Sequence, residues 1–295
     1  MLLRTGVPLL AEADELFRSD LYTEMVSFDR EFVARHASIL RSYVARWVPQ
    51  PMHQWSRRWE YPYTAQRLMQ FAAGADRPLT ILDAGSGITF FPYYLCERLG
   101  RVQVICCDRT RRYGAAFERL AEATGDASVS FVPAALQSLP LESASVDAIY
   151  CVSVLEHTGG HAAALDEFCR VLRPGGLLVL TFDISLDGRT QIPVDAARGL
   201  LRDTLDRFDG DPDLDYLGEL AKLDGPEELL TTDAVRRSDP SLLPWRWPLL
   251  KSTYDLLHGR GWTGGFFPLA FYCLDVRARG ADKVAEQDEL PEVQG

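Results

Sequence analysis

The stretch that decides the fold reads ILDAGSG and runs from Ile81 to Gly87. It completes an apolar strand predicted over residues 79–85 and leads into a helical pattern over residues 91–99. Two glycines at such a turn let the backbone bend sharply and approach a ligand closely, and the acid Asp83 stands directly before that turn. A strand, a Gly-x-Gly turn and a helix in this order predict a ligand-binding turn at the end of the strand.

Outward from this turn, strands and helices alternate along the chain. Strands are predicted over residues 79–85, 102–108, 129–134, 146–154, 177–184 and 266–277, and helices over residues 9–48, 64–73, 91–99, 113–124 and 161–172. The strands are apolar almost throughout, which indicates a mostly parallel sheet covered on both faces by helices. We therefore predict the α/β class with a doubly wound sheet. Right-handed crossovers in such a sheet place the ligand crevice at the carboxyl ends of the strands.

The segments outside this alternation define the predicted domain organisation. Residues 1–75 form an N-terminal helical segment, and residues 76–280 form the main domain, with an insertion at about 185–265 before the last strand. Because both additions flank the predicted strand ends, we expect them to act as a lid and a cap over the crevice. Residues 281–295 are charged and lack aromatic side chains, which is typical of a disordered tail.

Composition excludes several classes of function. The chain has 295 residues and a formal net charge of -11, and such an acidic protein would repel a nucleic acid over much of its surface. No apolar stretch approaches the length of a membrane span, and no signal peptide stands at the start. The six cysteines include no CxxC pair, which favours reduced thiols and a cytoplasmic location. The five histidines are scattered, so we expect no metal site.

A second acid, Asp108, ends the second strand and is placed to accept hydrogen bonds from ribose hydroxyls. A nicotinamide or flavin dinucleotide is one candidate ligand, but its fingerprint has a third glycine where Phe90 stands here. Asp83 beside the turn would also repel a pyrophosphate and attract an ammonium group. S-adenosylmethionine carries a ribose, an ammonium and a sulfonium but no phosphate, so this cofactor fits the charge pattern better.

Four motifs over residues 79–183 resemble those of the class I S-adenosylmethionine-dependent methyltransferases, particularly the small-molecule group called type 11. They are ILDAGSG, VICCD, VDAIYCVSVLEH and LRPGGLLVLT, in the order and spacing of that family. The resemblance implies a Rossmann-like methyltransferase fold with S-adenosylmethionine as the cofactor. One departure is Ala135, because the family often has an aspartate there that contacts the adenine amino group. The backbone amide of the next residue, Leu136, is still expected to meet the adenine ring.

Cofactor-binding roles are predicted at the ends of the first two strands. The predicted cradle consists of Asp83, Gly85, Ser86 and Gly87, for which the alternative is an ordinary strand-to-helix turn. Asp108 is predicted to bind the ribose, although an aspartate there also suits a helix N-cap. Arg109 lies along the adenine or is a surface charge.

Further site residues are predicted on both sides of these turns. By resemblance, Ser153 belongs to the turn beneath the transferring methyl group. His157 is the candidate general base, or else only a residue at a helix start, and His161 is a weaker candidate of the same kind. Arg57 precedes the domain and would bind the carboxylate of the cofactor, unless it is a solvated charge.

Three groups of side chains are candidates for the acceptor pocket. Asp183 ends the fifth strand and could point into the crevice. The aromatic residues of the segment before the domain could line a substrate cavity or pack the N-terminal helices onto the core: Trp55, Trp59, Tyr61 and Tyr63. Residues 245–247, a Trp-Arg-Trp run, could belong to the cap.

These observations predict an S-adenosylmethionine-dependent transfer of a methyl group to an oxygen or nitrogen nucleophile of a small molecule, by in-line displacement. A sugar, an amino-acid derivative or a natural-product intermediate would suit an enclosed pocket. Three alternatives stay open: an aminopropyl transferase, an NAD-dependent enzyme, and a non-catalytic protein that keeps the cofactor fold. The sequence leaves the oligomeric state open.

Overall fold

The computed structural model describes residues 2–44, 51–225, 228–243, 252–253, 256–257 and 266–280, and its centre is one eight-stranded sheet. The strand order is β3-β2-β1-β4-β5-β8-β7, with β6 beside β5. Strands β1 to β6 pair in parallel, whereas β8 is antiparallel to both β5 and β7. The strands are β1 (Leu79–Ala84), β2 (Val102–Asp108), β3 (Val129–Pro133), β4 (Val146–Val152), β5 (Leu172–Ser185), β6 (Ile192–Pro193), β7 (Phe208–Asp209) and β8 (Leu269–Ala278). The predicted doubly wound α/β fold is confirmed.

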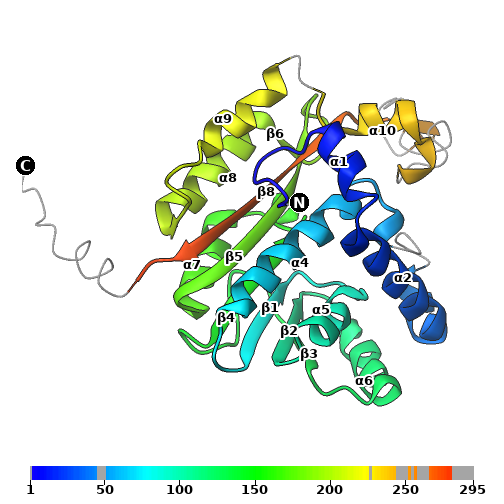
Figure 1. Ribbon diagram of the computed structural model, residues 1–295, viewed down its shortest axis with the longest axis vertical. Coiled ribbons are helices and arrows are strands. Elements are labelled where there is room, and N and C mark those ends of the chain that lie inside the picture. The colour runs from blue at the N-terminus through cyan, green and yellow to red at the C-terminus, as the bar shows by residue number, and fades with distance from the viewer. Residues whose placement is uncertain are drawn as a thin grey trace, which may run out of the picture.

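Helices cover both faces of this sheet (Figure 1). The α-helices are α1 (Leu10–Leu16), α2 (Asp20–Arg35), α3 (Ala37–Val44), α4 (Arg57–Ala73), α5 (Phe91–Leu99), α6 (Gly114–Thr124), α7 (His161–Val171), α8 (Val194–Arg207), α9 (Tyr216–Ala221) and α10 (Thr232–Ser238). Short 3-10 helices are η1 (Pro51–His53), η2 (Arg111–Tyr113), η3 (Leu155–His157), η4 (Lys222–Asp224) and η5 (Pro240–Leu242).

Successive strand residues feed two separate hydrophobic cores, one on each face. In β1, Ile81 packs into the core beneath α4, α5 and α6, and Leu82 packs into the core beneath α7, α8 and α9. This follows from the two-residue period of a strand, which sends alternate side chains to opposite faces. Five of the six cysteines are buried in these cores and all six are free thiols, as predicted. Within the described residues, no helix has both the length and the apolarity needed to cross a bilayer.

The N-terminal helices differ from the prediction in their boundaries. The continuous pattern over residues 9–48 is divided into α1, α2 and α3. Ser19 begins α2 by accepting a hydrogen bond from the Tyr22 amide at 3.2 Å, and α2 ends at Arg35 with His36 as its C-cap. Helix α4 begins at Arg57, ahead of the predicted start at residue 64, and it contains Pro62. Burial of the aromatic side chains on this part of α4 outweighs the low helix propensity of proline.

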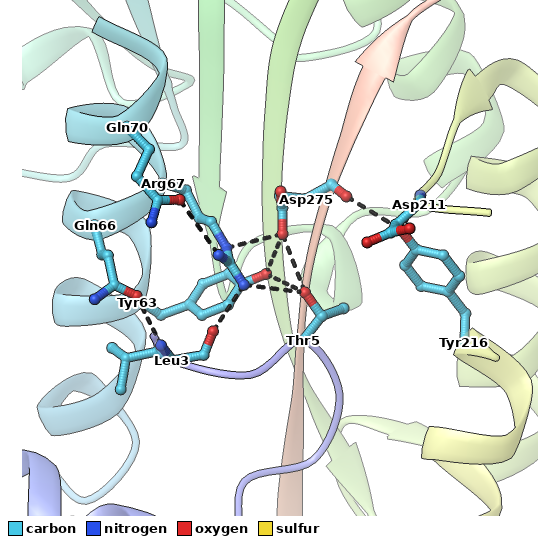
Figure 2. A network of polar contacts seen from close by, with 9 residues as sticks. All are labelled: Leu3, Thr5, Tyr63, Gln66, Arg67, Gln70, Asp211, Tyr216 and Asp275. Carbon is cyan, nitrogen blue, oxygen red and sulfur yellow. Dashed lines mark hydrogen bonds and ion pairs between the residues drawn. The ribbon is translucent and has the colours of Figure 1, made fainter. Parts of the chain in front are cut away.

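A polar network ties the start of the chain to α4 and β8 (Figure 2). Gly6 pairs with Cys273 of β8 through two backbone hydrogen bonds of 2.7 and 3.0 Å. The Asp275 carboxylate accepts hydrogen bonds from Tyr63 and Thr5 at 2.7 and 3.0 Å, and it forms an ion pair with Arg67 at 2.9 Å. The first residues are therefore anchored along β8.

The insertion before β8 packs mainly on the face of the sheet that α7 covers, opposite to α4. Helix α8 packs against α7 and α9, beside β5 (Figure 1). A later part, Asp239–Leu243, returns to the α4 side, where the Leu242 carbonyl accepts a hydrogen bond from the Trp55 amide at 3.1 Å. Residues 245–247 and the predicted tail 281–295 lie outside the described residues.

A carboxylate clamp at the amino-terminal end of the central strands gives a test of stability. Asp147 of β4 accepts hydrogen bonds from Arg77 at 3.0 Å and from the Thr80 amide at 2.8 Å, and forms an ion pair with Arg173 at 2.8 Å. Burial disfavours the charged form, but these partners outweigh it and lower the pKa of Asp147. We expect Asp147→Asn to reduce the free energy of unfolding by about 1–2 kcal/mol at pH 7, since solvent partly screens both guanidinium groups.

The effect of Asp147→Asn should depend on pH in one direction. A lowered pKa in the folded state stabilises the protein above the ordinary value of 3.8, and this contribution is lost as the pH falls below it. Urea unfolding of the wild type and of Asp147→Asn at pH 7 and at pH 3 measures the loss of stability and its dependence on pH. An equal difference at the two pH values would contradict the assignment to the charged carboxylate.

Candidate active site

A cavity of about 270 Å³ lies at the carboxyl ends of β1, β2 and β4. This is where a doubly wound sheet is predicted to bind its ligand. Four groups of residues line it: Asp83, Gly85, Ser86, Gly87 and Thr89 after β1; Asp108 and Tyr113 after β2; Tyr150, Val152, Ser153, Val154 and His157 from β4 onward; and Pro51, Gln54, Arg57 and Tyr61 from η1 and α4. The structure thus brings together most of the predicted site residues.

The glycine turn after β1 has the backbone conformation that its sequence predicts. Gly85 and Gly87 have positive φ angles of 85° and 54°. The amides of Gly85 and Ser86 donate to the Cys107 carbonyl at 2.8 and 2.9 Å, and the Gly87 amide donates to Asp108 Oδ2 at 3.3 Å. All three amides of the turn are therefore engaged within the protein.

The two acids of the cavity stand in different environments. Asp83 is 5% exposed, and burial raises its pKa to about 8, with Tyr150 beside it opposing the shift. Asp108 is held by the Thr110 amide, which donates to Oδ1 at 2.7 Å. Both carboxyl groups line the cavity, so hydrogen-bond acceptors gather on its β1 and β2 side.

A buried polar cluster forms the opposite side of the cavity, where α4 meets β4 and β5. Arg57 pairs with the fully buried Glu60 and donates from Nη1 to Ser153 Oγ at 2.7 Å. Glu60 Oε1 also accepts from Ser153 and Thr181 at 2.6 and 2.5 Å. Ser153 has φ of 49°, which is rare for a residue with a side chain. This conformation is held by a hydrogen bond from the Ser153 amide to the Thr181 carbonyl at 2.9 Å. The cluster holds the Arg57 guanidinium at the cavity wall.

Sequence reasoning missed Glu60 and Thr181. Glu60 stands three residues after Arg57, a spacing at which side chains meet on one helix face. This spacing has meaning only if both residues lie on one helix. Because the helix was predicted to start at residue 64, the pair was not recognised. Other lining residues not predicted are Pro51, Gln54, Thr89, Tyr113, Tyr150, Val152 and Val154.

The two predicted histidines have different positions. His157 lines the cavity, and desolvation together with the nearby Arg57 guanidinium lowers the pKa of its ring, which keeps the ring neutral and able to accept a proton near pH 7. His161 lies at the start of α7 and contacts Asp203 of α8 through Nε2 at 2.8 Å. His161 is not a lining residue of this cavity.

The residues predicted to contact adenine lie beside the cavity and do not line it. Arg109 is exposed, and Leu136 is 4% exposed within the core. Ala135 closes a turn through its carbonyl, which accepts from the Ser138 amide at 3.0 Å. The residue before this turn is tied to the end of β2, because the Ala134 amide donates to the Asp108 carbonyl at 3.1 Å.

The aromatic segment before the domain divides between the two roles considered. Tyr61 lines the cavity, where its ring stacks on Phe91 with centroids 4.6 Å apart. Trp55, Trp59 and Tyr63 are buried in the core and pack the N-terminal helices onto the sheet. No group of three potential metal ligands occurs among the described residues.

Asp83 gives a prediction in which the effect of a substitution on stability depends on pH. Because its pKa is raised from 3.8 to about 8 in the folded protein, the carboxyl group costs increasing stability as the pH rises between these values. We expect the free energy of unfolding of Asp83→Asn to exceed that of the wild type by about 1–3 kcal/mol at pH 8.5 and to differ little from it at pH 4. Urea titrations at both pH values test this. A variant less stable at pH 8.5 would contradict it.

The fold and the cavity together define a class: a Rossmann-like α/β protein whose ligand site is rich in acceptors and carries the Arg57 guanidinium. The family of methyltransferase domains matches residues 82–180. This match confirms, for that part of the chain, the predicted resemblance to the class I S-adenosylmethionine-dependent methyltransferases of type 11. Residues 82–180 form a methyltransferase domain.

Two curated relatives and one solved structure carry related descriptions. A ubiquinone/menaquinone biosynthesis C-methyltransferase of Syntrophotalea carbinolica is 33% identical over 128 residues, 43% of this chain and 51% of the relative. A probable S-adenosylmethionine-dependent methyltransferase of Mycolicibacterium smegmatis is 32% identical over 129 residues, 43% of this chain and 44% of the relative. The chain thus matches about half of each relative. Geranyl diphosphate C-methyltransferase from Streptomyces coelicolor, with S-adenosyl-L-homocysteine, has a TM-score of 0.49 and 16% identity, over 75% of this chain and 77% of that chain.

Proposed function

We propose that the whole protein transfers the methyl group of S-adenosylmethionine to an oxygen or nitrogen atom of a small molecule. The observation that carries this proposal is one cavity at the strand ends, in which Asp83 and Asp108 lie on one side and Arg57 on the other. An amino acid joined to a nucleoside needs these groups: acceptors for an ammonium and a ribose, and a cation for a carboxylate.

The residues present fit this cofactor. Asp108 would accept from the ribose hydroxyls, and Asp83 would face the ammonium group. Arg57 would bind the carboxylate, because among the described residues its hydrogen bonds all leave from Nη1, and Nε and Nη2 stay available. The cofactor supplies a methyl group on a positively charged sulfur, which leaves readily as a neutral thioether.

The same turn argues against a dinucleotide. A pyrophosphate is bound by free backbone amides at the start of a helix. Here the amides of Gly85, Ser86 and Gly87 are already bonded to Cys107 and Asp108. An NAD-dependent enzyme is therefore disfavoured on geometry as well as on sequence.

The protein contributes positioning and proton transfer. Ser153 and Val154 form the wall of the cavity at the end of β4, where an acceptor would be held against the cofactor. His157, neutral near pH 7, would accept a proton from an acceptor hydroxyl or amine. His161 has no part in this proposal, because its ring contacts Asp203 and does not line the cavity.

The flanking segments would enclose the site. Residues 1–75 would act as the lid through η1 and the start of α4, which supply Pro51, Gln54, Arg57 and Tyr61 to the cavity wall. The insertion at 185–265 would form the cap through the part that returns beside Trp55. The net charge of -11 disfavours a nucleic acid as the acceptor.

Titration calorimetry with S-adenosylmethionine, S-adenosylhomocysteine and NAD tests the proposal. We expect the first two to bind and NAD not to bind. Asp108→Ala should weaken binding about 10–100-fold, because charge-assisted hydrogen bonds to the ribose are lost. The control is Asp195→Ala, which removes a carboxylate that is 91% exposed on α8. Binding of NAD, or equal effects of the two substitutions, would refute the proposal. Cofactor binding without transfer to any acceptor would favour a non-catalytic role.

A further inference from the structure

Next to the cofactor cavity, two carboxyl groups lie together at the end of β5. Glu156 of η3 accepts a hydrogen bond at Oε1 from the Asp183 amide at 3.1 Å. Glu156 stands between Ser153 and His157, and both of these line the cavity. Because β5 is the neighbour of β4 in the sheet, this pair adjoins the methyl-transfer side of the site.

Each of these carboxyl groups has a buried oxygen without a partner. Among the described residues, neither Asp183 Oδ1 nor Glu156 Oε2 makes a hydrogen bond, and Asp183 is only 8% exposed. Along β5, Asp183 shares a face with Thr181, whose hydroxyl donates to Glu60 of α4. The Asp183 side chain therefore points toward the start of α4 and into the polar cluster. Buried polar atoms of this kind are normally satisfied by a partner.

The charges of the cluster do not balance. Glu60, Glu156 and Asp183 bring three carboxyl groups, and Arg57 is the only cation among the described residues that acts on Asp183. Arg57 is paired with Glu60, so neither Glu156 nor Asp183 forms an ion pair of its own among the described residues. Burial and their mutual repulsion raise the pKa of Glu156, and burial with the nearby Glu60 raises the pKa of Asp183 to about 7. A cationic ligand would relieve both the repulsion and the missing hydrogen bonds.

We propose that Glu156 and Asp183 form the acceptor subsite and that they bind a protonated amine, so that the acceptor is an amine. This inference rests on the proposed methyltransferase function and specifies its substrate class. The ammonium group donates to Asp183 Oδ1 and Glu156 Oε2. One carboxylate then takes a proton: an O–H bond forms, an N–H bond breaks, and the electron pair stays on nitrogen. The neutral amine formed in this way is the nucleophile that the reaction needs.

The test compares two probes of the same shape, n-butylamine and 1-butanol, titrated by saturation-transfer NMR into the full-length protein at pH 7.5, with and without saturating S-adenosylhomocysteine. We expect the butylammonium ion to bind at least about tenfold more tightly than the alcohol, since an ammonium can pair with the two acids. In Asp183→Asn and in Glu156→Gln the preference should fall to within about twofold. Asp195→Asn, on the exposed face of α8, is the matched control and should keep the full preference.

The outcomes separate this inference from the proposed function. Equal binding of the two probes, binding of neither, or a preference that survives both acid substitutions would overturn the amine subsite, whatever the cofactor does. Loss of the preference in Asp195→Asn as well would also overturn it, because the effect would then come from net charge. Failure of S-adenosylhomocysteine to bind, with the butylammonium preference intact, would instead refute the proposed methyltransferase function. Asparagine and glutamine keep the shape of the acids, and folding of each variant is checked by its thermal unfolding.

Discussion

We expect the Gly85→Ala variant to bind S-adenosylmethionine about 100-fold more weakly than the wild type and to lose about 2–4 kcal/mol of unfolding free energy. Gly85 has φ of 85°, and a Cβ atom there would lie 2.5 Å from both γ-methyl groups of Val154. Valine has few alternative rotamers, so the backbone must move. Because Gly85 and Val154 both line the cavity, this movement displaces the cofactor cradle.

Two controls separate the clash from the cost of the backbone conformation. Gly188 has φ of 70° and no atom within 4 Å of its added Cβ, so Gly188→Ala measures the positive-φ cost alone, about 1 kcal/mol. Gly85→Ala combined with Val154→Ala removes the clashing methyl groups and should recover part of the stability. Calorimetry and urea unfolding measure the two effects. Equal losses in Gly85→Ala and Gly188→Ala would contradict the steric argument.

The residues at the strand ends were predictable because their roles follow from local sequence. Asp83 and the two glycines lie between an apolar strand and a helix, and this order fixes both their conformation and their place in a parallel sheet. Asp108 was placed by the same rule one strand later. The parallel order of the first five strands followed from their apolar character, which requires cover on both faces.

The other side of the site was predictable only in part, because it depends on contacts between distant segments. Arg57 and Ser153 were singled out, but their connection through Glu60 and Thr181 joins α4, β4 and β5. No periodicity in the sequence encodes such a meeting. The same reason explains why His161 was predicted as a second candidate base although it does not line the cavity. Its ring contacts Asp203, a residue of the insertion whose packing against α7 could not be derived locally.

The Arg57–Glu60 pair gives the second large expected effect. Arg57→Met should lower the free energy of unfolding by about 3–5 kcal/mol, because it leaves the fully buried Glu60 carboxylate without its cation. It should also abolish detectable binding of S-adenosylmethionine, whose carboxylate Arg57 is proposed to hold. Thermal or urea unfolding and titration calorimetry measure the two losses separately.

A second substitution distinguishes the structural role of Arg57 from its role in binding. In Arg57→Met combined with Glu60→Gln, the glutamine carbonyl can still accept from the hydroxyls of Ser153 and Thr181, and residue 60 no longer carries a buried charge without its cation. We expect most of the stability to return and the binding to stay lost, since the cation for the ligand carboxylate is still missing. Recovery of both would mean that Arg57 acts only by neutralising Glu60. The pair would then belong to the scaffold of the cavity, and the carboxylate of the cofactor would need another partner.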